Sequence, residues 1–272
     1  MYNKNTNKRF MKNFLTVLAL SMAAQASADT LVTDSLAYKA ANDYAECEII
    51  VDAPRDADSD IAMVVNNFIH AQLDTYRLRA ADNVSGVVTQ GVVETCGKHR
   101  LASLMSDAKD VYGTDKPTAP FAYGAEIRKE FENDNVITYT STVYTYEGGA
   151  HPMTVRTSET YSKLLASQLT YNNSFSEEGI KALKRMLKDG LKKYFEVTAD
   201  NELVGMLLGI DDPDDIPLPK AEPFLTKDGL TLRYAQYEIA PYAAGMPTVV
   251  IPMAKVRSVL RPIVADDFVP ES

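Results

Sequence analysis

The sequence Tyr144-Thr145-Tyr146-Glu147-Gly148-Gly149-Ala150-His151-Pro152 runs from a predicted strand into a sharp turn. Its two tyrosines stand at alternate positions, so they share one face of that strand. The adjacent glycines permit positive φ angles, which a tight turn often requires. The turn therefore presents an imidazole next to two tyrosines, and the candidate ligand-binding residues of this stretch are Tyr144, Tyr146, Gly148, Gly149 and His151.

Three predicted strands surround this turn. Phe121–Phe131 and Val136–Tyr146 alternate apolar and polar residues, and Glu132–Asn135 between them is typical of a hairpin turn. Met153–Tyr161 returns as a third strand after the glycines. The simplest topology is an antiparallel meander with one polar face.

Apolar residues at helical spacing predict helices over Ile61–Ala81, Val92–Val111 and Ile180–Phe195. The last of these follows a capping-box pattern at Ser174–Glu177. Its other face is rich in lysine, which indicates either a solvated face balanced by acidic neighbours or a surface for a membrane or an acidic partner. A strand at Ala45–Val51 precedes the first helix.

A hairpin over Phe224–Gln236, a strand over Thr248–Met253 and a short helix over Ala254–Leu260 complete the predicted elements. The fold class is therefore α+β, with antiparallel sheets built from meanders and hairpins and with helices packed on one face. The turn-rich stretch Gly113–Pro120 predicts a boundary between an N-terminal α+β subdomain at 29–117 and a C-terminal α+β domain at 118–264. Residues 265–272 have the composition of a frayed tail.

The first 28 residues have the pattern of a secretory signal peptide. A basic beginning precedes the short apolar run Phe14–Ala24, and Ala26-Ser27-Ala28 is a small-residue cleavage site. Translation starts at Met1 or at Met11. We expect cleavage after Ala28 and a periplasmic or extracellular protein, with no transmembrane segment in the mature chain.

The mature chain is strongly acidic. The whole sequence has 28 basic and 37 acidic residues. Four of the basic residues and none of the acidic ones lie in the signal segment, which leaves 24 against 37 and a net charge of −13. This charge repels nucleic acid and anionic membranes and favours a cationic partner. The alternative explanation is that a net negative charge simply keeps the protein soluble.

Two cysteines and three histidines bear on the chemistry. In an exported protein Cys47 and Cys96 predict one disulfide, and the alternative is two buried thiols. His70 lies off the apolar stripe of its helix and is expected to be exposed, while His99 stands in a basic patch. No spacing predicts a zinc site, a phosphate-binding loop or a serine nucleophile elbow, so the sequence predicts no metal and no cofactor.

The central stretch also carries a resemblance. Tyr144–Pro152 resembles the Tyr-x-Tyr-x-Gly-Gly-Ala-His motif of the RsiV-type domain of unknown function. Ser174–Phe195 stands where that family has its following helix. Tyr237–Gly245, which contains the further ligand-binding candidate Tyr242, is similar to the closing motif of the family together with Val249–Pro252.

The N-terminal part resembles the companion domain of RsiV and of PdaC-type deacetylases, through the strand Cys47–Val51 and the helix Ile61–Tyr76. RsiV is an anti-sigma factor whose extracytoplasmic part binds lysozyme, and PdaC is a peptidoglycan deacetylase whose chemistry lies in a separate domain. The chain shows no sigma-binding segment and no deacetylase metal motif. The resemblance therefore implies the extracytoplasmic module alone.

Two hypotheses follow. The first is a non-catalytic binding module of the cell envelope, whose ligand is a lysozyme-like cationic protein or a cell-wall glycan such as a peptidoglycan fragment. The second is a cell-envelope hydrolase or deacetylase-associated protein that uses His151 as a general base, with Glu147 or Tyr146 nearby. Because no catalytic partner stands at a defined spacing from His151, the sequence favours binding.

Overall fold

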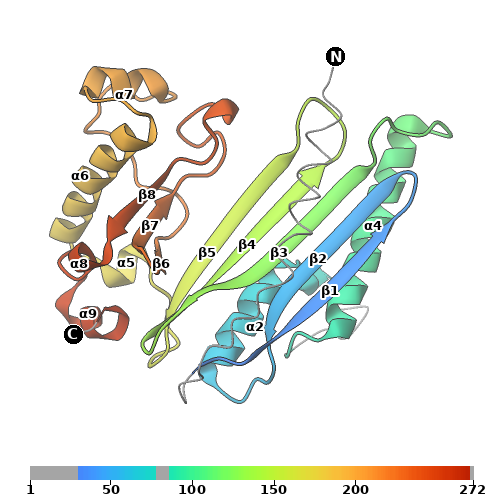
Figure 1. The fold of residues 1–272 in the computed structure, drawn as a ribbon, viewed down its shortest axis with the longest axis horizontal. Helices are drawn as coiled ribbons and strands as arrows, with labels where there is room; N and C mark the ends of the chain where they lie inside the picture. Colours follow the sequence, from blue (N-terminus) through green and yellow to red (C-terminus); the bar gives the residue numbers. More distant parts are fainter. Residues whose placement is uncertain (1–29, 78–85, 270–272) are drawn as a thin grey trace. The chain divides into compact units, whose positions relative to one another are not determined.

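The computed structural model describes residues 30–77 and 86–269 (Figure 1). The predicted signal peptide lies outside the described residues. Residues Leu31–Ser272 form one compact unit. Within it are a five-stranded sheet and a three-stranded sheet, and their pairings are mostly antiparallel, so the chain has an α+β fold as expected.

The larger sheet has the strand order β1-β2-β3-β4-β5. Its last three strands form the predicted meander, with antiparallel pairing of β3 to β4 and of β4 to β5. The hairpin of β1 and β2 was not predicted as a pair. The bounds are β1 Thr33–Ala41, β2 Ala45–Pro54, β3 Phe121–Glu132, β4 Val136–Tyr146 and β5 Met153–Ser162.

One pairing in this sheet departs from the antiparallel expectation. β2 and β3 are parallel, with Ala45 opposite Phe121. Parallel neighbours need a long crossover, and here the crossover contains α2 (Asp60–Gln72), η1 (Thr75–Arg77) and α4 (Gln90–Tyr112). The boundary expected at residue 117 therefore falls between two strands of one sheet.

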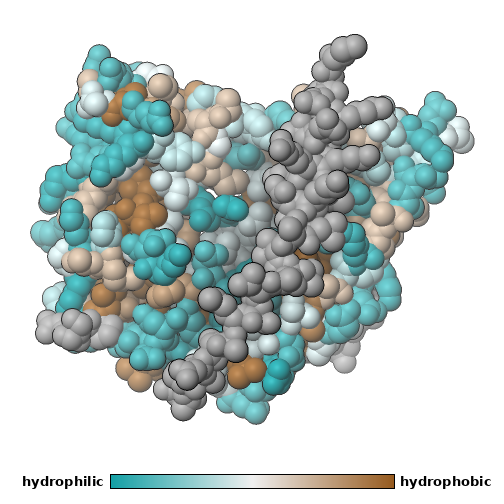
Figure 2. Space-filling view, in the orientation of Figure 1, coloured by the Kyte–Doolittle hydropathy of each residue, from teal (hydrophilic) through white to brown (hydrophobic). Residues whose placement is uncertain are grey.

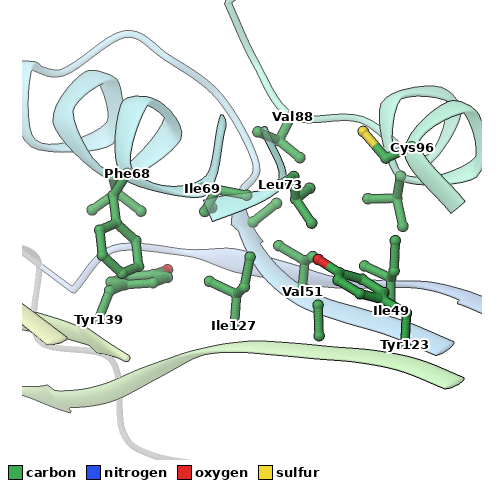
Figure 3. Close-up of a cluster of buried hydrophobic side chains, with 14 of the residues drawn as sticks. Ile49, Val51, Phe68, Ile69, Leu73, Val88, Cys96, Tyr123, Ile127 and Tyr139 are labelled. Atoms are coloured by element: carbon green, nitrogen blue, oxygen red, sulfur yellow. The ribbon is translucent and has the colours of Figure 1, made fainter. Parts of the chain in front are cut away.

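The first core lies between this sheet and the helices α2 and α4 (Figure 3). Alternate residues of β2, including Ile49 and Val51, face the helices and are buried. From α2, Phe68 meets the ring of Tyr139 edge-on, with centroids 6.3 Å apart. Each such buried side chain stabilises the fold by about 1.5–3 kcal/mol.

Close packing of α4 on β1 depends on one glycine. A Cβ atom at Gly97 would lie 2.0 Å from Cδ1 of Tyr38, which is far inside van der Waals contact. Only a residue without a side chain lets the tyrosine ring lie flat on the helix. The hairpin of β1 and β2 is thus fixed to α4 by a close approach that hydrophobic periodicity does not report.

The second core is built around the three-stranded sheet, in the order β6-β7-β8. The helix α6 packs on β8 through Leu183, Leu187 and Leu191, which are fully buried at the spacing of one helical face. The bounds are α5 Tyr171–Ser174, α6 Glu177–Tyr194, α7 Asp200–Met206, β6 Phe224–Thr226, β7 Gly229–Arg233, η2 Tyr242–Ala244, β8 Thr248–Pro252, α8 Met253–Val256 and α9 Pro262–Phe268.

The two sheets are joined by buried hydroxyl groups. Thr138 of β4 donates its hydroxyl to the carbonyl of Leu225 at 2.8 Å, and Thr160 of β5 accepts from the amide of Leu225 at 2.7 Å. The two hydroxyls also bond to each other at 2.7 Å. Because both threonines point away from the helices of the first core, β6 covers that end of the polar face of the meander.

Three local predictions require correction. The residues 265–268 are not a frayed tail, since α9 buries Ala265 and Phe268 in the second core. The N-cap of α6 is Ser176, whose hydroxyl accepts from the amide of Gly179 at 3.0 Å, and not Ser174. His70 is fully buried, because its ring bonds to Thr75 and to a backbone carbonyl and so loses no hydrogen bond on leaving water.

The basic face of α6 agrees with the solvated interpretation. Lys188 forms an ion pair with Asp214 at 2.6 Å, and Asp200 neutralises Lys192. Both carboxylates come from segments that follow the helix. Two lysines of this face are therefore neutralised by acidic residues of the same chain.

The predicted disulfide is not present. Cys47 on β2 and Cys96 on α4 are both buried thiols in the first core. Burial raises the pKa of the Cys47 thiol to about 12, with the charge of Arg100 opposing part of the rise. The alternative of two buried thiols is the arrangement that the structure has.

Candidate functional site

The two motif segments, distant in sequence, meet on the surface of the described unit. His151 from the turn between β4 and β5 contacts Tyr237 and Tyr242 from the loop between β7 and β8. We call His151, Tyr237 and Tyr242 the ring cluster. Two of its members, His151 and Tyr242, are among the residues that the sequence singled out.

The hydrogen bonds of His151 define its tautomer. Nδ1 lies 3.0 Å from the carbonyl oxygen of Pro152, which can only accept, so Nδ1 carries a proton. Nε2 lies 3.2 Å from the hydroxyl of Tyr237 and accepts from it in the neutral ring. Both ring nitrogens of His151 are therefore engaged within the protein.

The rings are also stacked. His151 and Tyr242 have centroids 4.1 Å apart and planes inclined by 22°. Tyr237 lies 5.7 Å from Tyr242, at an angle of 35°. The hydroxyl of Tyr242 donates to the carbonyl of Pro152 at 3.1 Å, so this one oxygen accepts from two members of the cluster. The hydrogen bonds fix the orientation of the rings, while His151 and Tyr237 remain exposed.

The loop that carries the tyrosines is held by specific bonds. Glu238 accepts from the amides of Ala235 and Lys220, each at 2.7 Å. Gln236 accepts from the amide of Thr154 on β5 at 3.1 Å, which ties the loop to the edge of the larger sheet. Tyr237 itself has φ of +64°. A non-glycine residue in this region signals a conformation imposed by its surroundings.

The two glycines have the backbone angles that the sequence predicts. Gly148 has φ of +84° and Gly149 has φ of +91°. A Cβ atom at Gly148 would lie 3.4 Å from the ring of Phe121, whereas nothing lies within 4 Å of one at Gly149. Both glycines shape the turn that places His151, and neither supplies a polar side chain to a ligand.

The two tyrosines of the strand play different parts. The hydroxyl of Tyr146 donates to the carbonyl of Gly149 at 3.4 Å, which supports the turn. Tyr144 pairs across the sheet with Gly124 on one side and Thr154 on the other, on the face away from α2 and α4. Tyr144 therefore lies on the same face as the residue that anchors the loop of Tyr237.

Tyr237 is the member that sequence reasoning missed. It begins the segment that resembles a family closing motif, but nothing in that segment predicts that its hydroxyl reaches His151. The contact depends on the junction between the two sheets. A signal was nevertheless present, because three tyrosines cluster in the nine residues Tyr234–Tyr242.

The geometry gives little support to catalysis by His151. Its Nε2 faces a tyrosine hydroxyl and its Nδ1 faces a carbonyl, so no carboxylate orients the ring as in a catalytic triad. Glu147 is exposed on the same turn. Within residues 30–77 and 86–269, no group of three or more acidic, histidine or cysteine residues is arranged to hold a metal ion.

A separate recess of about 420 Å³, lined by both polar and apolar residues, lies between α6 and β8. Its lining includes Met186, Val249 and Ile251, and Val250 on the same strand is 45% exposed. Figure 2 shows hydrophobic residues gathered over this part of the molecule. The recess is lined by none of the residues of the ring cluster.

The fold and the ring cluster together define an α+β module with two hydrophobic cores and an exposed aromatic site at the junction of two loops. Two family models match the chain. Residues 162–254 match the model described as "Protein of unknown function (DUF3298)", and residues 38–154 match "Deacetylase PdaC". The two matches support both domain types and do not confirm the RsiV-type assignment. The Tyr144–Pro152 motif lies within the match to PdaC and not within the match to DUF3298.

Two solved structures share the fold over most of the chain. A member of the DUF3298 family from Bacteroides fragilis is 22% identical with a TM-score of 0.63, covering 87% of this chain and 96% of its own. A DUF3298 family protein from Pseudomonas aeruginosa is 16% identical with a TM-score of 0.60, covering 86% and 96%. No curated protein matches the sequence.

In the part of the chain that is described, no helix is both long and apolar enough to cross a membrane.

Proposed function

We propose that this protein is an exported, non-catalytic binding module of the cell envelope, and that the ring cluster is its contact surface for a cationic protein of the lysozyme kind. The observation that carries the proposal is the convergence of two motif segments on one exposed set of stacked rings. Core packing does not require this arrangement, because the rings lie at the surface.

The chemistry of the rings suits protein binding. Tyr237 is 47% exposed, and its hydroxyl is held by His151, so little side-chain entropy remains to be lost on binding. Tyrosine is enriched among the residues that dominate binding energy at protein interfaces, since it combines a large apolar area with a polar tip.

The charge of the chain supports a cationic partner. Cleavage after Ala28 leaves a net charge of −13, as counted above. Such a field accelerates encounter with a basic protein and weakens as salt is added. Export is supported by the basic, apolar and small-residue pattern of the first 28 residues, and it brings the protein to the compartment where lysozymes act.

Titration calorimetry with a lysozyme at low ionic strength tests the proposal. We expect saturable binding that weakens with salt and that weakens at least tenfold in Tyr237→Ala and in His151→Ala. Tyr76→Ala is a matched control, because Tyr76 on η1 is also 47% exposed but lies outside the ring cluster. Far-UV circular dichroism verifies the fold of each variant.

Three results would overturn the proposal. Absence of saturable heat with lysozyme excludes this partner class, and binding of a soluble peptidoglycan fragment instead would assign the rings to a glycan. If lysozyme binds but the ring variants bind like the wild type, the contact surface lies elsewhere. If the protein hydrolysed a cell-wall substrate and the His151→Ala variant did not, the hydrolase alternative would be favoured.

A further inference from the structure

Two positively charged arginines lie near each other in this acidic chain. Arg233 ends β7 and Arg156 lies on β5. Burial lowers the pKa of Arg233, and the charge of Arg156 lowers it further. We call these residues the arginine pair. Like charges are normally kept apart or neutralised, so two neighbouring arginines that form no ion pair with any described carboxylate require a reason.

A hydrogen bond places the guanidinium of Arg233 against the strand that carries Arg156. Its Nη1 donates to the hydroxyl of Ser158 at 3.4 Å. Ser158 follows Arg156 by two positions on β5, so both side chains leave the same face of the strand. That face is the one directed away from α2 and α4.

The ring of Phe224 also holds Arg233 in place. Its guanidinium carbon lies 4.7 Å from the centre of the Phe224 ring, which supports one face of the planar group. The hydroxyl of Ser158 is fixed in turn by Thr140 at 2.9 Å. The guanidinium of Arg233 is therefore positioned by an aromatic ring and a hydroxyl network before any ligand arrives.

No carboxylate of the described residues forms an ion pair with either member. Burial is the largest cause of the lowered pKa of Arg233, to about 10, and the charge of Arg156 adds to it. Glu130 acts on Arg233 only through a weaker, opposing charge effect. Burying an unneutralised cation beside another cation is unfavourable, and a bound anion removes both costs.

We propose that the arginine pair, with the hydroxyls of Ser158 and Thr140, is a binding site for a carboxylate group of a ligand. A guanidinium presents two parallel N–H donors that match the two oxygens of a carboxylate. Because the hydroxyls of Ser158 and Thr140 bond to each other, one of the two keeps a free proton to donate to the same carboxylate. Arg156 is exposed and can meet the ligand from solvent, while Arg233 is half-buried.

The site adjoins the ring cluster without sharing its residues. Thr154, two positions before Arg156 on the same face of β5, donates its amide to Gln236, which directly precedes Tyr237. A ligand that carries a carboxylate can therefore contact both features. The inference does not rest on the partner proposed above, since a small carboxylate tests it alone.

Thermal unfolding and calorimetry with citrate as the probe test the site, with sodium chloride added to hold the ionic strength constant. We expect saturable binding of citrate and a rise in Tm with citrate concentration. Arg156→Ala should weaken binding at least tenfold and abolish most of the rise. Arg185→Ala on α6 is the matched control, an exposed arginine outside the site, and should behave like the wild type.

Because Arg156 is exposed, its replacement by alanine should leave the protein folded, and a loss of citrate binding would then reflect the site itself. Arg233→Lys provides a second variant that retains the charge but loses the paired donors, and it should also bind citrate more weakly. Lack of saturable binding, an undiminished Tm rise in Arg156→Ala, or an equal loss in Arg185→Ala would each overturn the proposal. If inorganic phosphate bound as tightly as citrate, the site would bind oxyanions in general, and the proposed preference for carboxylates would be wrong.

Discussion

Tyr237 donates its phenol hydroxyl to Nε2 of His151 at 3.2 Å, across 86 residues of sequence. This bond joins the turn that follows β4 to the loop that follows β7, and those two strands belong to different sheets. Because the opposite nitrogen of His151 donates to the carbonyl of Pro152, the ring has one preferred tautomer. The relationship makes the ring cluster a preformed surface.

The first prediction concerns this tautomer. Neutral His151 should carry its proton on Nδ1, which is the less common form for a histidine in water. Long-range ¹H–¹⁵N correlation spectra of the imidazole distinguish the two nitrogens. Tyr237→Phe removes the hydroxyl that Nε2 accepts and should shift the equilibrium towards the Nε2-protonated form. A spectrum dominated by that form in the wild type would contradict the geometry.

The second prediction concerns the turn. Gly149→Ala should destabilise the protein by about 1 kcal/mol, because its φ of +91° disfavours any residue with a Cβ atom. Space is not the cause, since nothing lies within 4 Å of the added atom. Urea unfolding followed by circular dichroism measures the change.

Gly205→Ala is the matched control for this change. Gly205 lies within α7 and has equally open surroundings, but its φ is not positive. Alanine there should stabilise the helix by up to about 1 kcal/mol. If both variants shifted stability in the same direction, backbone strain at Gly149 would not be the reason.

The sequence predicts contacts between elements that are neighbours along the chain better than contacts between distant ones. The meander of β3, β4 and β5 was predicted because each strand pairs with its neighbour in the chain and alternates in polarity. The parallel pairing of β2 with β3 was not predicted, since residues far apart determine it. Periodicity reports which face is buried, and it carries no information on which distant strand lies alongside.

The same limit applies to single side chains. The sequence predicts an exposed His70 because this residue lies off the apolar stripe of α2. Its ring is in fact buried, and hydrogen bonds to Thr75 and to the carbonyl of Gly86 satisfy both ring nitrogens. The candidate site contains both residues that the sequence predicts and residues that it does not. His151 and Tyr242 were found from motifs, whereas Tyr237 and the arginine pair depend on how β7 and its loop meet β5, which no local pattern encodes.

The third prediction concerns stability in acid. Glu132 at the end of β3 is 9% exposed and is paired with Lys129 at 2.7 Å and Lys163 at 2.8 Å. Burial alone would raise the pKa of Glu132, but the hydrogen bonds from the two lysines and from the amide of Leu31 outweigh it and lower the pKa. The charged form is thus favoured in the folded state.

The sign of the effect follows from linkage. A carboxylate whose pKa is lower in the folded state contributes stability above its unfolded pKa, near 4.5, and loses it as the pH falls through the folded value. Glu132→Gln should therefore cost about 3 kcal/mol at pH 7, and much less in strong acid. Glu130→Gln on the same strand is exposed and should change stability by under about 0.5 kcal/mol. A cost that does not vary with pH would exclude this mechanism.

The last prediction concerns the thiols. Burial raises the pKa of Cys47 to about 12, so almost none of it is thiolate at pH 8, and alkylation by iodoacetamide should be slow in the native protein. In denaturant without reductant, intact mass should show that both Cys47 and Cys96 become labelled. A cysteine introduced by Ser103→Cys on the exposed side of α4 should react rapidly in the native state and serves as the control. Failure of both native cysteines to react in denaturant until reductant is added would show that a disulfide joins them, because only a disulfide withholds both sulfurs from an unfolded chain.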